Sequence, residues 1–173
     1  RVSHRGPDDE GIFIDRNLGL GHKRLSILDI SQLGHQPMVS DNGRYVIVHN
    51  GEIYNYREIR KELSDYPFKS NTDTEVILAS YITWGKDCLK KFNGMFAFSI
   101  WDKEQRILFI GRDRLGIKPL YYYKDESCFV FGSEIRSVTA SGLVKAELDK
   151  RGLIDNLRYS TVNTPATILK GIY

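Results

Sequence analysis

Two β-rich runs in the middle of the chain constrain the fold most strongly. Residues 95–101 read Met-Phe-Ala-Phe-Ser-Ile-Trp, residues 106–111 read Arg-Ile-Leu-Phe-Ile-Gly, and a polar turn at 102–105 joins them. This arrangement predicts a β-hairpin. Both runs carry apolar residues on both faces, as strands do when each face of their sheet is covered. We therefore expect two stacked sheets with helices on the outside.

The other elements follow from the same kind of periodicity. A helix is expected to open at Asn71–Thr74 and to end at Gly85, with a shorter helical piece at 87–92. The final segment carries one more helical pattern around Leu153 and Leu157. Short strands are expected at 12–14, 18–22, 119–123 and 127–132.

A second feature, an Asn-Gly pair, suggests a site. A short apolar strand begins at Tyr45 and is expected to stop at Asn50-Gly51. Asn-Gly is the strongest two-residue signal for a β-hairpin. Here, however, Asn55 can cap a following helix, with Glu58 placed for a capping box. An Asn amide beside a glycine N–H is a donor pair suited to an oxyanion in acyl transfer.

Two charged residues extend this site. Arg24 ends a strand and can clamp a carboxylate through two parallel hydrogen bonds, or form a surface ion pair with Asp29. Asp73 stands at the start of a helix, where it can accept an ammonium group or serve as an N-cap. With the Asn-Gly donor pair, these residues suit a free amino acid that has a side-chain carbonyl.

Composition narrows the function classes. The chain has 41% hydrophobic and 27% charged residues and a net charge of +3. Basic and acidic residues alternate, as in 57–62, which argues against nucleic-acid binding. No apolar run of bilayer length occurs, and we expect no signal peptide. We expect a cytoplasmic protein without membrane contact, in which Cys88 and Cys128 are separate reduced thiols.

Six segments in order along the chain resemble the class II glutamine amidotransferase domain, and most closely that of glutamine-hydrolysing asparagine synthetase. The Glu-Ile-Tyr-Asn continuation after Asn-Gly favours this family over hexosamine-phosphate and purine amidotransferases. The resemblance implies an N-terminal-nucleophile hydrolase fold: an α+β, four-layer αββα sandwich of two mostly antiparallel sheets. The segments are 5–11, 24–29, 50–55, 72–77, 94–98 and 111–120.

The resemblance also implies a set of site residues. Arg24 would hold the α-carboxylate of L-glutamine, and Asp73 would take its α-ammonium. The oxyanion hole would consist of Asn50 Nδ2 and the Gly51 N–H. Further pocket residues would be Leu25, Ser26, Ile27, Leu28 and Glu52.

The chain departs from the family pattern at both ends. The family nucleophile is an N-terminal Cys, whereas this chain starts with Arg1 and has no Cys-Gly-Ile opening. We expect the first strand and its Cys to lie outside the chain, which would then be inactive as given. The exposed sheet edge would favour a homodimer. Residues 1–145 are expected to form the amidotransferase domain, and 146–173 a linker and the start of a synthetase domain.

The expected activity is the glutaminase step of asparagine synthesis, which releases ammonia for ATP-dependent amidation of aspartate. ATP and Mg are expected in the synthetase domain of the same chain; no cofactor or metal is expected in this one. We interpret the acidic loop near Asp8 as a solvated turn and not as a metal site. Two alternatives stay open: an amidotransferase for a sugar or antibiotic acceptor, and a non-catalytic glutamine-binding or interaction domain.

Overall fold

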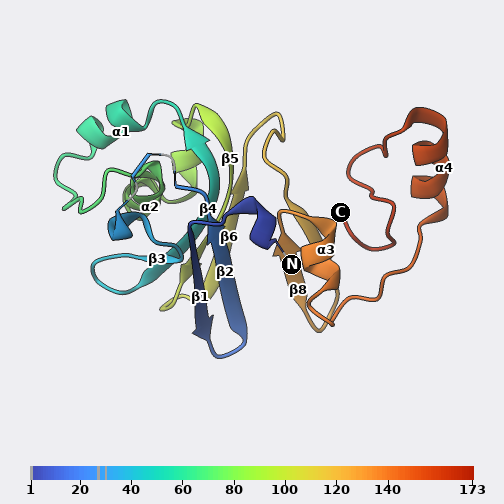
Figure 1. Cartoon of the computed structure of the whole chain (residues 1–173). Helices are drawn as coiled ribbons and strands as arrows, with labels where there is room; N and C mark the ends of the chain where they lie inside the picture. The colour runs from blue at the N-terminus through green and yellow to red at the C-terminus, as the bar shows by residue number, and fades with distance from the viewer. Residues whose placement is uncertain (1, 27, 30) are drawn as a thin grey trace. The chain divides into compact units, whose positions relative to one another are not determined.

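The computed structural model describes residues 2–26, 28–29 and 31–173. These residues form two compact units, Ser3–Lys118 and Pro119–Tyr173, the second together with Val2 (Figure 1). The boundary between the units follows Lys118. The expected start of a following domain at residue 146 stays a prediction.

The unit Ser3–Lys118 is built on a four-stranded antiparallel sheet in the order β3-β4-β5-β6. The predicted hairpin is confirmed as β5 and β6. A second, two-stranded antiparallel sheet pairs β1 with β2, so the expected sheets are present. The strands are β1 (Asp9–Asp15), β2 (Leu18–Arg24), β3 (Met38–Val39), β4 (Tyr45–Ile53), β5 (Gly94–Asp102) and β6 (Ile107–Arg112).

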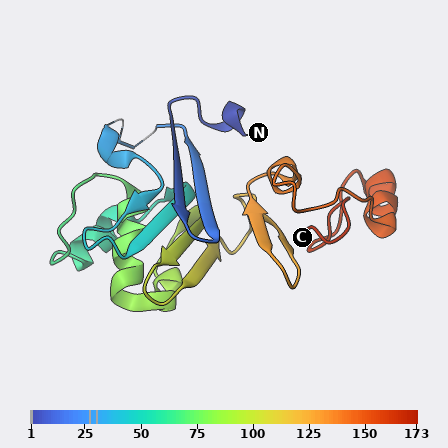
Figure 2. The same ribbon diagram turned by 90° about the horizontal axis from the view of Figure 1, so that it is seen from below.

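Side-chain alternation along β4 assigns the two faces of the central sheet. Ile47 and Ile53 belong to the core cluster that contains residues of helix α2 (Asp73–Trp84). Val46 and Val48 therefore point to the other face. Their neighbour on that face, Trp101, pairs with Val46 and donates from Nε1 to a carboxylate oxygen of β1 at 2.9 Å. Figure 2 shows α2 and the β1–β2 hairpin on different sides of the central sheet.

Helix α2 begins as the sequence predicts. The Thr72 hydroxyl accepts the Glu75 N–H at 3.2 Å, and the Glu75 carboxylate accepts the Ser70 N–H at 2.7 Å. Gly85 ends the helix at φ 57°, a left-handed value that glycine adopts readily. The N-cap is therefore Thr72, and the N-cap interpretation of Asp73 was wrong.

Replacing the cap allows a direct test. Thr72→Ala removes the acceptor for the Glu75 N–H, so we expect the free energy of unfolding to fall by about 1 kcal/mol. Thr72→Ser keeps the hydroxyl and should retain most of that stability. Urea denaturation followed by circular dichroism measures both values. Equal losses in the two variants would show that the methyl group, and not the cap, stabilises this end of α2.

Helix α1 (Tyr56–Glu62) forms where expected, but the predicted cap was wrong. Asn55 makes no side-chain capping bond. Its Nδ2 donates to the Lys91 carbonyl at 2.9 Å, and its Oδ1 accepts the Asn93 N–H at 2.9 Å. Only two residues separate β4 from α1, so Asn55 lies beside the turn that leads into β5 and bonds there instead.

The unit Pro119–Tyr173 has a small core of its own, made by Val138, Val144 and Ile172. The predicted strands 119–123 and 127–132 appear as the antiparallel pair β7 and β8. No helix among the described residues is long and apolar enough to cross a membrane. The elements of this unit are β7 (Tyr121–Lys124), β8 (Phe129–Gly132), α3 (Ile135–Thr139) and α4 (Lys150–Tyr159).

Candidate functional site

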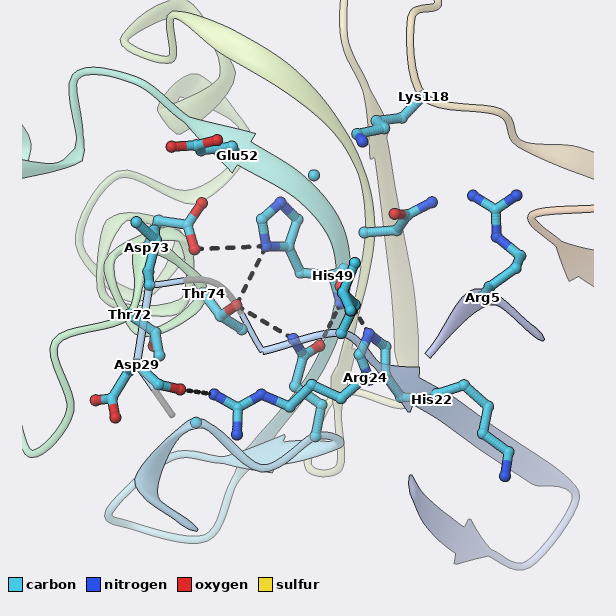
Figure 3. A pocket seen from close by; sticks show the side chains of 17 residues that line it. Arg5, His22, Arg24, Asp29, His49, Glu52, Thr72, Asp73, Thr74 and Lys118 are labelled. Carbon is cyan, nitrogen blue, oxygen red and sulfur yellow. Dashed lines mark hydrogen bonds and ion pairs between the residues drawn. The ribbon is translucent and has the colours of Figure 1, made fainter. Parts of the chain in front are cut away.

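A cavity of about 230 Å³ lies along the second half of β4, within the unit Ser3–Lys118 (Figure 3). Strand β3 pairs only with the first half of β4, through Val46 and Ile47. Beyond that point, side chains take the place of a strand partner. Gln36 Oε1 accepts the His49 N–H at 2.6 Å, and Asp73 Oδ2 accepts the Ile53 N–H at 2.8 Å.

The Asn50-Gly51 pair lies inside a strand and not at a turn. Strand β4 continues through it to Ile53, so both the expected end of the strand and the hairpin alternative were wrong. Gly51 stands opposite Phe96 at φ 151°. A Cβ on Gly51 would lie 2.1 Å from the Met95 carbonyl oxygen. Glycine is needed here because β4 and β5 approach too closely for a side chain.

The register of β4 and β5 determines where the Gly51 N–H points. The N–H and C=O of Phe96 both bond to Asp113, at 3.2 and 2.8 Å, on the side of β5 away from β4. Gly51 and Phe96 are therefore a non-hydrogen-bonded pair, whose backbone groups point away from one another. The Gly51 N–H consequently faces the edge along which the cavity lies. This position suits the predicted oxyanion donor, and that role stays a prediction.

Arg24 is buried at the end of β2, with 7% of its surface exposed. Its guanidinium donates to the backbone carbonyl of Ser31 at 3.0 Å and to that of Asp29. It also lies so close to Gly34 that a Cβ there would come within 1.9 Å of Nη2. The surface ion-pair alternative was wrong, because Arg24 is buried and bonds to the backbone. The hydrogen bonds to Asp29 and Ser31 fix this loop against the Arg24 guanidinium, and the loop forms one wall of the cavity.

Asp73 lies in the first turn of α2 and is 5% exposed. Burial raises the pKa of its carboxyl group, and the hydrogen bond from the Ile53 N–H opposes this effect. Its Oδ1 lies 3.9 Å from His49 Nδ1 (Figure 3). A buried carboxylate stabilises a bound cation strongly.

The structure brings together most of the predicted site residues. Ser26 is not among the described residues that line the cavity; its N–H donates to Asp8 Oδ2 at 2.7 Å. Ile27 lies outside the described residues. The predicted residues found on the cavity wall are Arg24, Leu25, Leu28, Asn50, Gly51, Glu52 and Asp73.

Sequence reasoning missed two histidines of the cavity wall, His22 and His49. His22 Nε2 lies 3.0 Å from the backbone oxygen of His49. Burial lowers the pKa of His22 to about 4 and that of His49 to about 3. The sequence offers only a weak signal for them, because a histidine within a β-strand does not by itself indicate a site.

Lys118, also missed, reaches the cavity wall from the loop after β6. The Asp113 carboxylate accepts the N–H groups of Ile117 and Lys118 at 2.8 and 3.0 Å. Arg112 Nε donates to the Lys118 carbonyl at 2.7 Å. Arg112 and Asp113 therefore both bond to the backbone of this turn.

Neither cysteine lines the cavity. Cys88 is buried in the core of the unit Ser3–Lys118, and burial raises the pKa of its thiol to about 12. Such a thiol is inert as a nucleophile at neutral pH. Cys128 belongs to the other unit. Among the described residues, no cluster of three or more His, Cys, Asp or Glu side chains could hold a metal ion.

The comparisons with known proteins agree with this fold. The family described as "Glutamine amidotransferase domain" matches residues 1–173. A glutamine phosphoribosylpyrophosphate amidotransferase from B. subtilis shares the fold, with a TM-score of 0.61 and 22% identity over 77% of this chain and 31% of that one. The chain belongs to the class II glutamine amidotransferase domain family, and its N-terminal-nucleophile hydrolase fold is confirmed.

The similar curated proteins include glutamine-hydrolysing asparagine synthetases, as the sequence motifs predicted. Asparagine synthetase 3 of Bacillus subtilis is 44% identical over 99% of this chain and 28% of its own length. Asparagine synthetase B of Escherichia coli is 47% identical over 72% of the chain and 23% of its own length. The amidase chry2 of Gibberella zeae is 40% identical over 82% of the chain and 22% of its own length. The chain thus spans less than a third of the length of these relatives.

Proposed function

We propose that the cavity binds L-glutamine and that the domain supplies ammonia by hydrolysing it. The observation that carries this proposal is the convergence of three groups on one cavity: a buried guanidinium at Arg24, a buried carboxylate at Asp73 and a strand-edge N–H at Gly51. They complement the α-carboxylate, the α-ammonium and the side-chain carbonyl of glutamine. Leu25, Leu28 and Glu52 would complete the wall around the ligand.

The reaction we propose is acyl transfer to a thiol. A thiolate attacks the amide carbon of glutamine, and the oxyanion forms within reach of Asn50 Nδ2 and the Gly51 N–H. The C–N bond breaks, the nitrogen takes a proton and ammonia leaves; water then cleaves the thioester to give glutamate. The described cavity wall contains no cysteine, so the proposal assigns this thiol to a cysteine outside the described residues.

For the parent protein we propose an asparagine synthetase. Its synthetase domain would use ATP and Mg to activate aspartate for amidation by the released ammonia, and the parent would form homodimers. The synthetase names of relatives at 44% and 47% identity support this acceptor. The relative named amidase chry2 is not named a synthetase, so an asparagine-synthetase-like amidotransferase with another acceptor is the second candidate.

Calorimetric titration tests glutamine binding. The wild-type chain should bind L-glutamine, and Arg24→Met should weaken the affinity by about a hundredfold, because a buried charge pair is lost. Arg106→Met is the matched control: its guanidinium pairs with Asp15 at 3.1 Å and does not line the cavity. This control should leave the affinity unchanged.

A ligand without the α-carboxylate separates direct contact from loop disruption. The decarboxylated analogue 4-aminobutanamide should bind the wild type and Arg24→Met with equal affinity, because it presents nothing for Arg24 to hold. If Arg24 acted only by supporting the loop at Ser31, both ligands would lose affinity together. Absence of glutamine binding to the wild-type chain would contradict the proposed function itself.

A further inference from the structure

Two buried nitrogens on residues of the cavity wall have no hydrogen-bond partner among the described residues, His22 Nδ1 and His49 Nε2. His49 is 4% exposed, and its Nε2 has no hydrogen-bond partner among the described residues. A buried polar atom that makes no hydrogen bond costs free energy. Figure 3 shows the imidazole ring beside Asp73, with Nδ1 joined to Asp73 and Thr74 by dashed lines. The unpartnered Nε2 is on the other side of the ring.

The neighbours of the ring favour one tautomer. Gln36 Oε1 accepts the His49 backbone N–H, so Gln36 Nε2 faces Thr74 and donates to its hydroxyl at 3.3 Å. His49 Nδ1 lies 3.2 Å from the same Thr74 oxygen and 3.9 Å from the Asp73 carboxylate. A proton on Nδ1 is stabilised by that negative charge and can be donated to Thr74. Nε2 then carries a lone pair.

Burial keeps the ring neutral. It lowers the pKa of His49 to about 3, and the positive charge of Lys118 adds to the effect. At neutral pH His49 is therefore an uncharged hydrogen-bond acceptor and does not repel a cation. The Asp73 carboxylate beside it supplies the negative charge that attracts one.

We infer that His49 is a specificity-determining residue whose Nε2 accepts an N–H from the α-ammonium of the bound amino acid, which it shares with Asp73. This inference rests on the proposed function. An ammonium group has three N–H donors and needs acceptors in different directions. Asp73 Oδ1 and His49 Nε2 supply two of them, from two different directions. The pair selects ligands that carry a protonated amine.

Two substitutions at His49 separate the roles of its two nitrogens. His49→Asn places a polar atom near Nδ1 and can keep the bond to Thr74, but it removes the acceptor at Nε2. His49→Gln places an amide oxygen near Nε2. We expect His49→Asn to weaken L-glutamine binding by about tenfold to a hundredfold, the range for a hydrogen bond to a charged group. His49→Gln should stay within a few-fold of the wild type.

The deaminated ligand 4-carbamoylbutanoate, which lacks the ammonium group, is the control. Its affinity, measured by the same calorimetry, should be equal in the wild type and His49→Asn. Equal losses for both ligands would show a structural role for His49 and overturn the inference, as would undiminished glutamine binding by His49→Asn. In either case the proposed function stands. Absence of glutamine binding to the wild-type chain overturns the proposed function and this inference together.

NMR of the His49 ring nitrogens in the wild-type chain tests the inference directly. It does not depend on whether a substituted chain folds. The His49 ring should show a protonated Nδ1 and an unprotonated Nε2. The Nε2 signal should shift when L-glutamine is added and stay in place with 4-carbamoylbutanoate. A protonated Nε2, or equal shifts with both ligands, would overturn the inference.

Discussion

Gly51→Ala is expected to destabilise the domain by about 4 kcal/mol or more, among the largest effects of a single substitution. The new Cβ would lie 2.1 Å from the Met95 carbonyl oxygen and 2.6 Å from Phe96 Cα. Both are backbone atoms of a central strand, so relief requires β5 to move away from β4. The value of φ, 151°, adds strain for any residue with a side chain. Thermal unfolding should show a midpoint lower by about 10 °C or more.

Gly43→Ala is the matched control for the backbone conformation. Gly43 has φ 71°, but a Cβ there would meet no atom within 4 Å. Gly43→Ala should therefore lower the free energy of unfolding only by the cost of holding alanine in a left-handed conformation, about 1–2 kcal/mol. A larger loss at Gly51 reflects the close approach of β4 and β5 together with the less accessible φ of Gly51. Equal losses would mean that this approach contributes nothing and that φ alone demands glycine.

The second large effect is expected for Asp113→Ala. The Asp113 side chain is 6% exposed and accepts the N–H groups of Phe96, Ile117 and Lys118. Without it the Phe96 N–H stays buried and unpaired, while those of the loop can turn toward water. At about 1–3 kcal/mol for a buried unpaired group, we expect a total loss of about 3 kcal/mol in urea denaturation. The loop that carries Lys118 to the cavity should loosen as well.

Asp125→Ala is the control for Asp113→Ala. Asp125 also accepts backbone N–H groups, those of Ser127 and Cys128, but in the exposed turn between β7 and β8. Water can replace that carboxylate, so its removal should change stability much less than Asp113→Ala does. Losses of equal size would show that burial does not determine the contribution of such a carboxylate.

The Asp113 contribution should depend on pH in a defined direction. Burial raises the pKa of this carboxyl group, but the hydrogen bonds from Lys118, Ile117 and Phe96 outweigh it, so the pKa is lowered. The stabilisation is then fully present above the unfolded-state pKa of about 3.9 and is lost as pH falls through the folded-state value. The stability difference between wild type and Asp113→Asn should shrink as pH falls below about 4. A constant difference down to acid unfolding would contradict this.

Local sequence patterns predicted many elements correctly because their signals are local. The apolar runs at 95–101 and 106–111 predicted the β5–β6 hairpin, and the polar segment 71–74 predicted the start of α2. Two local signals misled. Asn50-Gly51 has the composition of a turn, yet lies within β4, because the contact that demands glycine comes from β5. Asn55 has the composition of a cap, yet bonds to Lys91 and Asn93.

The sequence by itself determined the family of this chain and the residue types of its site, since Arg24, Gly51 and Asp73 stand within recognisable motifs. Only the tertiary structure decided how the open half of the β4 edge is closed. Gln36 and Asp73 bond to its N–H groups from segments that precede and follow the strand. Local periodicity carries no information about such pairings, because they depend on how distant segments pack. The same holds for His49, whose partnerless Nε2 is evident only once Thr74 and Asp73 lie beside its other nitrogen.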